Sequence, residues 1–253
     1  MPAVTTPALI LHVMPYGETS KILRLLTREL GLQSAIARGA RRARARTGPR
    51  LDLFAAGTAT LAVKPLRELH PLTDFELTDA HGAIAADVGR FAAASALAEL
   101  ALRCAPPDVH PEVFETASAG LDALAAAPAA LVGAAGLTVV WALVVALGFA
   151  PEVDRCVVCG EGVEGVLAFS PEQGGALCGE HRRGVRTAQL RSEDAAALAA
   201  LLAGRLPEPP LDERHAAAHR RLLLGFIRHH LAEEREMPAM AFWDGEAWNA
   251  TSS

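Results

Sequence analysis

Aromatic residues are scarce in this chain, whose 253 residues include only 8 Phe, 3 Trp and 1 Tyr. A hydrophobic core must therefore be built mainly from Ala, Leu and Val, which in long runs favour helix. Hydrophobic residues make up 51% of the chain and charged residues 21%, as in ordinary globular proteins. The length is sufficient for two domains or one two-lobed domain. We expect a helix-rich fold.

The sequence also lacks a secretory signal and a disulfide framework. Its first residues, MPAVTTPALILHVMPYGETSK, have no basic stretch ahead of a long apolar run, so we expect the protein to stay inside the cell. Only four cysteines are present, two of them as Cys-x-x-Cys and one alone at Cys104. This usage fits a reducing compartment with a metal site better than it fits disulfides.

Acidic residues outnumber basic ones overall, giving a formal net charge of −5, but the two parts of the chain differ. Residues 1–80 carry 11 Lys/Arg against 7 Asp/Glu, a net charge of +4. Residues 81–253 carry 13 against 22, a net charge of −9. This asymmetry predicts that the first part meets a polyanion while the rest keeps the protein soluble and has another task.

Up to residue 80 the pattern favours short strands. The segments separated by turn residues are ALILHV, KILRLLT, LQSAIAR, TATLAV and LHPLTDFELT. KILRLLT alone would equally fit a helical turn. Five short strands in so short a stretch predict a small closed or partly open β-barrel.

After residue 80, Ala/Leu-rich segments predict helices over 83–104, 109–127, 193–204 and 212–236. Asp212 is a natural N-cap and Gly204 a natural C-cap. The tail that follows has no periodicity and is expected to be loose. The fold class is therefore α+β, with an N-terminal barrel domain over 1–80 and a helical domain over 81–253.

The segment 131–150, LVGAAGLTVVWALVVALGFA, contains no charged residue and is long enough to cross a membrane. Its three glycines, the missing basic clusters at its ends and the acidic flank EVDR argue against a membrane span. A helix that is apolar on every side also suits the middle of a helical bundle. We favour a buried central helix over a transmembrane one.

A metal-ligand pattern occupies the Gly-rich insertion at 152–187. Cys156, Cys159, Cys178 and His181 follow the spacing C-x2-C-x18-C-x2-H, in which two tight turns each supply two ligands. Zinc accepts thiolate and imidazole together in a tetrahedron, so we predict one structural zinc that staples the insertion. The alternatives are ordinary buried cysteines and a catalytic zinc, although a catalytic site usually keeps an open fourth position.

Six arginines without an acid lie between residues 38 and 50: Arg38, Arg41, Arg42, Arg44, Arg46 and Arg50. Guanidinium groups at this density suit phosphate oxygens, although a charge run is often only a solvated loop. Further cations that support phosphate binding lie in neighbouring strands, at Lys21, Arg24, Lys64 and Arg67. The only aromatics available for base stacking are Tyr16, Phe54 and Phe75, so binding should be electrostatic and indifferent to base sequence.

Arginines also recur every seven residues on the last long helix, at Arg214, Arg221, Arg228 and Arg235, and so share one face. Leu224 and Leu231 border this stripe. Arginine beside leucine suits an acidic partner segment with apolar side chains. A solvated face whose charges pair with other helices is an equally good interpretation.

Four segments together resemble the RecO family of recombination mediator proteins: GETSKILRLLT, GLQSAIARGARR, LGFAPEVDRCVVCG and FSPEQGGALCGEH. The resemblance implies an N-terminal OB-fold, a helical body and a zinc-binding insertion. It also implies binding of single- and double-stranded DNA, annealing of complementary strands, association with RecR, and help for RecA in replacing single-stranded-DNA-binding protein (SSB).

Residue by residue, the resemblance makes Arg38, Arg41 and Arg42 DNA contacts. Where the family often has a fourth cysteine, this chain has His181, a replacement that zinc chemistry tolerates. The leading hypothesis is a cytoplasmic, nucleoid-associated DNA-binding mediator that is not an enzyme and contacts the SSB tail through the arginine stripe. The alternatives are a zinc-dependent enzyme that acts on nucleic acid and a membrane protein anchored by 131–150.

Overall fold

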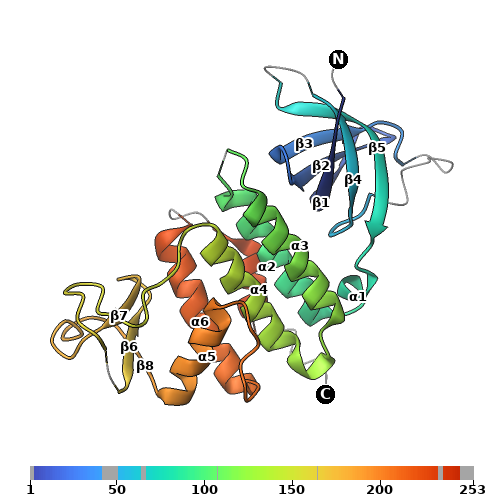
Figure 1. Ribbon diagram of the computed structural model, residues 1–253. Helices are drawn as coiled ribbons and strands as arrows, with labels where there is room; N and C mark the ends of the chain where they lie inside the picture. Colours follow the sequence, from blue (N-terminus) through green and yellow to red (C-terminus); the bar gives the residue numbers. More distant parts are fainter. Residues whose placement is uncertain are drawn as a thin grey trace.

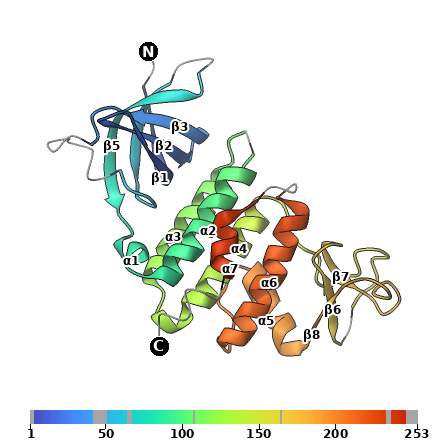
Figure 2. The ribbon, with the colours of Figure 1, turned by 180° about the vertical axis from the view of Figure 1, so that it is seen from behind.

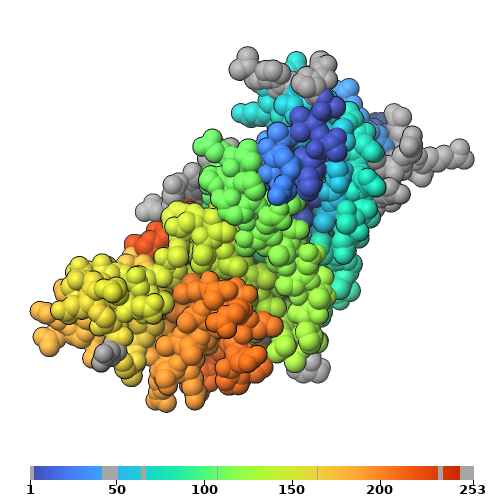
Figure 3. All heavy atoms as spheres, viewed as in Figure 1, coloured from blue at the N-terminus to red at the C-terminus, as the bar shows by residue number. Residues whose placement is uncertain are grey.

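The computed structural model describes residues 3–41, 51–63, 67–106, 108–163, 165–232 and 236–245. It is elongated, with a β-barrel at one end, a helical body in the middle and a small β module at the other end (Figures 1 and 2). The space-filling view shows the same order, from the blue barrel through the green helices to the yellow and orange module (Figure 3).

Five strands form the barrel: β1 (Ala3–Tyr16), β2 (Ser20–Thr27), β3 (Gly31–Ala37), β4 (Ala56–Ala62) and β5 (Leu69–Asp79). Their order is β1-β2-β3-β5-β4, and antiparallel pairing of β1 with β4 closes the barrel. The β3–β5 pair is parallel and the other pairs are antiparallel. The predicted OB-like barrel is confirmed, and KILRLLT is a strand.

Inward-facing and outward-facing side chains alternate along the strands. Small and aliphatic residues on the inward side fill the barrel with few aromatics. Along β4, Gly57, Ala59 and Leu61 are buried while their neighbours are partly exposed, which is the period of a half-buried strand. Gly57 has to be small, because a Cβ there would lie 2.3 Å from the carbonyl oxygen of Glu76. It would also lie 2.8 Å from the ring of Phe75, a fully buried core residue.

The helical body contains α1 (Gly82–Ala85), α2 (Val88–Cys104), α3 (Pro111–Ala126), η2 (Ala129–Leu131), α4 (Val132–Ala146), α5 (Ser192–Leu202), α6 (Glu213–His230) and α7 (Pro238–Asp244). The helix predicted over 83–104 is divided, because Asp87 accepts a hydrogen bond from the Arg90 N–H and starts α2. Asp212 caps α6 through the His215 N–H, as predicted. Gly204 follows α5 with a φ of +67°, which also agrees with its predicted capping role.

The apolar segment that includes α4 is the centre of the body. Residues 129–146 are the one helical stretch among the described residues that is long and apolar enough for a membrane span, and 61% of it is buried inside the protein. α4 packs against α2, α3, α5 and α6, with Trp141 fully buried. Such burial is typical of a core helix, which is the interpretation that the sequence favours over a membrane span.

The tail is not wholly loose, which corrects the prediction for residues 237–253. Residues 238–244 form α7, which packs on α2. The Glu99 side chain accepts hydrogen bonds from the Ala239 and Met240 N–H groups, at 2.9 and 3.0 Å. Trp243 is 1% exposed and lies close to Gly136 of α4.

The barrel and the body meet through shared apolar and polar contacts. Phe54 of the barrel packs edge-on against Phe91 of α2, with ring centroids 5.6 Å apart. Its carbonyl oxygen lies 2.8 Å from Nδ1 of His81, whose Nε2 lies 2.9 Å from Asp122 of α3. An ion pair joins the Arg28 guanidinium to Glu115 at 2.5 Å.

The module at the far end is a sheet of β6 (Leu167–Ser170), β7 (Gly175–Leu177) and β8 (Ala188–Leu190), in the order β7-β6-β8. It is attached to α6, because Nε2 of His230 lies 2.8 Å from the Pro171 carbonyl oxygen and Gly225 lies against the same proline. This module carries the predicted metal ligands.

Candidate metal centre and nucleic-acid interface

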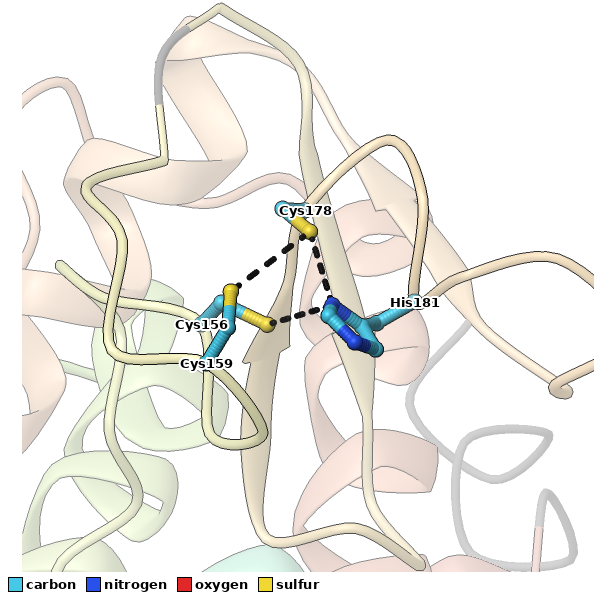
Figure 4. A group of neighbouring side chains, drawn as sticks. All are labelled: Cys156, Cys159, Cys178 and His181. Atoms are coloured by element: carbon cyan, nitrogen blue, oxygen red, sulfur yellow. Dashed lines mark hydrogen bonds between the residues drawn. The ribbon is translucent and has the colours of Figure 1, made fainter.

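The four predicted metal ligands come from two turns of the module. Cys156 and Cys159 lie on a turn that the Gly160 N–H closes with a 2.8 Å hydrogen bond to the Cys156 carbonyl, and Gly160 has a φ of +74°. Cys178 follows β7 directly, and His181 lies on the next turn, which the Arg182 N–H closes onto the Cys178 carbonyl. Figure 4 shows the four side chains pointing toward one another.

The separations suit a single tetrahedral ion. The four ligand atoms all lie within 4.8 Å of one another. Cys159 Sγ is 3.9 Å from Cys178 Sγ, and His181 Nδ1 is 3.8 Å from Cys156 Sγ and 3.1 Å from Cys178 Sγ. Zinc–sulfur bonds of about 2.3 Å require sulfurs roughly 3.8 Å apart in a tetrahedron. The cluster can therefore hold a metal ion.

Two of the three cysteine thiols have a lowered pKa. Burial raises the pKa of Cys156, but N–H groups of Cys159, Cys178 and Val158 outweigh burial and lower it overall. The His181 N–H likewise lowers the pKa of Cys178. The Glu161 N–H lowers the pKa of Cys159, but burial and the two neighbouring sulfurs together raise it to about 11. Three thiolates repel one another, and a divalent cation removes that repulsion.

A second cluster, Asp79, His81 and Asp122, has a different role. Both ring nitrogens of His81 already face acceptors, the Phe54 carbonyl and the Asp122 carboxylate. Asp79 accepts a 2.7 Å hydrogen bond from the His81 N–H. These groups satisfy one another at the contact between barrel and body, so the cluster is structural. The sequence contains no signal for it beyond a histidine that follows the last barrel strand.

The predicted DNA-binding residues lie in different environments on the barrel. Arg38 is exposed just after β3, and Arg24 on β2 is half-buried. The Arg41 guanidinium donates to the Gly17 carbonyl at 3.3 Å, and its N–H donates to the Thr19 carbonyl. Lys21 donates to the Leu51 carbonyl at 2.8 Å and pairs with Asp52. The predicted residues Arg42, Arg44, Arg46, Arg50 and Lys64 lie outside the described residues.

The arginine stripe of α6 lines a groove of about 1800 Å³ between α6, α7 and the module. Arg214, Arg221 and Arg228 are exposed on its wall, and Leu224 is 7% exposed. Arg235 lies outside the described residues. The groove also contains Glu172, Asp194, Glu236 and Asp244, so it is not uniformly basic.

Two further arginines that the sequence pattern does not reveal, Arg186 and Arg191, also line this groove. In the described part of the chain, no guanidinium group that lines this groove forms an ion pair or a side-chain hydrogen bond. His219 lies at the groove and is 1% exposed, and neither ring nitrogen has a hydrogen-bond partner. Burial lowers the pKa of His219, and Asp194 at 3.7 Å opposes that effect.

Comparison with known protein families identifies two matches. The family described as Recombination protein O N terminal matches residues 1–81, which contain the barrel. The family described as Recombination protein O C terminal matches residues 85–237, which contain most of the helices and the module. The chain belongs to the RecO family. The resemblance seen in the sequence motifs is confirmed, and membership supports a role in recombinational DNA repair.

Relatives named DNA repair protein RecO match along most of the chain. The protein of Anaeromyxobacter dehalogenans strain 2CP-C is 35% identical over 252 residues, which cover 96% of this chain and 97% of the relative. That of Synechococcus sp. strain JA-3-3Ab is 32% identical, covering 79% and 69%. That of Heliobacterium modesticaldum is 35% identical, covering 69% and 65%. The RecO relationship therefore includes both the barrel and the helical body.

Proposed function

We propose that this protein is a DNA-binding mediator of recombinational repair. It binds single- and double-stranded DNA, anneals complementary strands, and with RecR helps to load RecA onto single strands covered by SSB. It acts in the cytoplasm at the nucleoid and is not an enzyme. Membership of the RecO family carries this proposal, supported by an OB-like barrel whose sequence bears the Arg-rich segment 38–50.

Residues 1–80 and 81–253 act as two domains with separate tasks in this proposal. The first part has a net charge of +4, and the second a net charge of −9. Annealing requires two phosphate backbones to approach each other, which costs electrostatic free energy unless cations lie between them. The arginines of 38–50 supply those cations, and the acidic helical part is left for protein partners such as RecR.

The Arg-rich segment is tested by replacing Arg42, Arg44 and Arg46 with Ala in the full chain. Arg41 is kept, because its guanidinium holds the β1–β2 turn. We expect weaker binding to single strands of any base sequence, with the slope of log K against log salt reduced by about 2, since each lost phosphate contact removes about 0.7. Fluorescence anisotropy over a salt series measures this, and strand annealing should slow in parallel.

The matched control replaces Arg182, Arg183 and Arg205, three exposed arginines away from the barrel. It removes the same charge and should leave the salt slope unchanged. Equal slopes for the wild type and the barrel variant would show that the segment does not contact DNA.

We propose that Cys156, Cys159, Cys178 and His181 bind one structural zinc ion. Four protein ligands fill a tetrahedral shell and leave no open position for substrate. The ion supplies folding free energy to a module of three short strands. The competing function is a zinc-dependent enzyme acting on nucleic acid. That alternative requires turnover of DNA or RNA that stops when zinc is chelated.

We further propose that the α6 groove binds the acidic, apolar C-terminal tail of SSB. Arg214, Arg221 and Arg228 offer charge to carboxylates, and the 7% exposed Leu224 lines the same groove. Arg186 and Arg191, which line the same groove from another part of the chain, support this interpretation of the stripe over a merely solvated face. Unpaired guanidinium groups from separate elements can bind the carboxylates of one extended peptide.

A further inference from the structure

Tyr16 is exposed where other barrel aromatics are buried. It is the only tyrosine of the chain, ends β1 and has 55% of its surface exposed. Phe54 and Phe75 are both buried in the core and cannot contact a ligand. Single exposed apolar residues are common on protein surfaces, so the exposed ring indicates a ligand only together with its surroundings.

The surroundings of Tyr16 form a groove of about 940 Å³ at one end of the barrel. The β1–β2 turn, the end of β3 and the start of β5 meet there, and Arg38, Arg67 and Leu69 line it with Tyr16. Ligand pockets usually measure about 300–1,000 Å³, so the groove has room for a nucleotide and its neighbours.

Charge in this groove suits phosphate. Arg38 and Arg67 are exposed, and within the described ranges neither guanidinium forms an ion pair. Glu68 is the one acid among the described residues that line the groove. The Arg-rich part of the sequence begins next to it, because Arg41 donates to the Gly17 and Thr19 carbonyls of the turn that follows Tyr16. An anionic ligand is therefore favoured over a cationic one.

We propose that Tyr16 stacks on an unpaired base of single-stranded DNA while Arg38 and Arg67 contact the flanking phosphates. This inference rests on the proposed DNA binding and adds a means of discrimination. A base in a duplex is stacked on both faces, whereas an unpaired base offers a free face to an aromatic ring. Tyr16 therefore strengthens binding to single strands only, so an annealed product is held without this stacking contribution.

Substitution at Tyr16 separates stacking from charge. The full chain is compared with Tyr16→Ala, Tyr16→Phe and Arg38→Ala, using labelled oligo(dT) and a duplex of equal length over a salt series. Stacking of one base corresponds to roughly tenfold in affinity, so Tyr16→Ala should bind oligo(dT) about tenfold more weakly with an unchanged salt slope. Tyr16→Phe keeps the ring and should bind like the wild type. Arg38→Ala should lower the slope by about 0.7.

Duplex binding should be the same for the wild type and Tyr16→Ala. Phe242→Ala, which truncates a 47% exposed ring on α7, is the matched control and should change nothing. As a direct readout, oligonucleotides that contain 5-iodouracil should crosslink to Tyr16 under ultraviolet light, located by mass spectrometry.

If the wild type and Tyr16→Ala bind oligo(dT) equally well, the proposed stacking by Tyr16 is wrong, while the proposed DNA binding of the protein is retained. If Tyr16→Ala weakens oligo(dT) and duplex equally, the residue only supports the turn, and the inference is again wrong. If the wild type binds neither DNA, the proposed function itself fails.

Discussion

The described arginines that line the α6 groove form neither ion pairs nor side-chain hydrogen bonds. We predict that changing Arg221 and Arg228 together to Glu weakens binding of an SSB tail peptide at least tenfold, about 1.4 kcal/mol, because two attractions become repulsions. Fluorescence anisotropy with a labelled tail peptide and the full chain measures this.

The control for the groove is Arg183→Glu with Arg205→Glu, which makes the same charge change at exposed positions outside it. If the tail peptide binds the Arg221/Arg228 variant as well as it binds the control, the groove is not its site. A loss of equal size in both variants would mean that only net charge matters.

Residue-level prediction from sequence succeeds where the determinants are local. Cys156 and Cys159 were predicted as a pair, and Cys178 with His181 as another, because each turn is encoded within four residues. The α6 stripe was predicted from its seven-residue period. Arg186 and Arg191 were not, since they reach the groove through the pairing of β8 with β6, which no short-range pattern encodes.

At the scale of elements, α7 shows how packing creates a helix without a sequence signal. We predict that Trp243→Ala lowers the free energy of unfolding by about 3–5 kcal/mol, since the buried indole fills space beside Gly136 and Ala93. Phe242→Ala, which removes the exposed neighbouring ring, should change stability by no more than about 0.5 kcal/mol. Urea unfolding followed by circular dichroism measures both. Similar values would mean that α7 is not docked in solution.

The strands and long helices could be predicted because their periodicity is continuous over many residues. β1 to β5 lie close to the five predicted segments, and α4 is the buried helix expected from 131–150. The tail could not be predicted in the same way. Seven residues are too short for a reliable helical period, and what orders α7 is the Glu99 carboxylate at its first N–H groups together with a site for Trp243 on α2 and α4.

At the scale of the whole molecule, the metal cluster and the barrel lie at opposite ends, with the helical body between them (Figure 1). The module contacts α6, whereas the barrel contacts α2 and α3 through Phe54, His81 and Arg28. A change confined to the module therefore has no direct route to the proposed DNA-binding surface on the barrel. We therefore expect the proposed zinc ion to govern stability at one end and to leave the proposed DNA binding at the other end unchanged.

We predict one bound zinc per chain, measured by atomic emission, and no bound zinc in Cys178→Ser. Cys104→Ser removes the one cysteine outside the cluster and should keep the ion.

Removing zinc should lower the free energy of unfolding by about 4 kcal/mol relative to a solution whose free zinc is about 1,000 times its dissociation constant. Oligo(dT) binding at a temperature where the chelated protein is still folded should stay within about twofold, because the proposed DNA-binding arginines of 38–50 lie more than 100 residues before the metal ligands in the sequence. A loss of DNA binding under those conditions, with circular dichroism unchanged, would show that the module contacts DNA and that zinc is more than a staple.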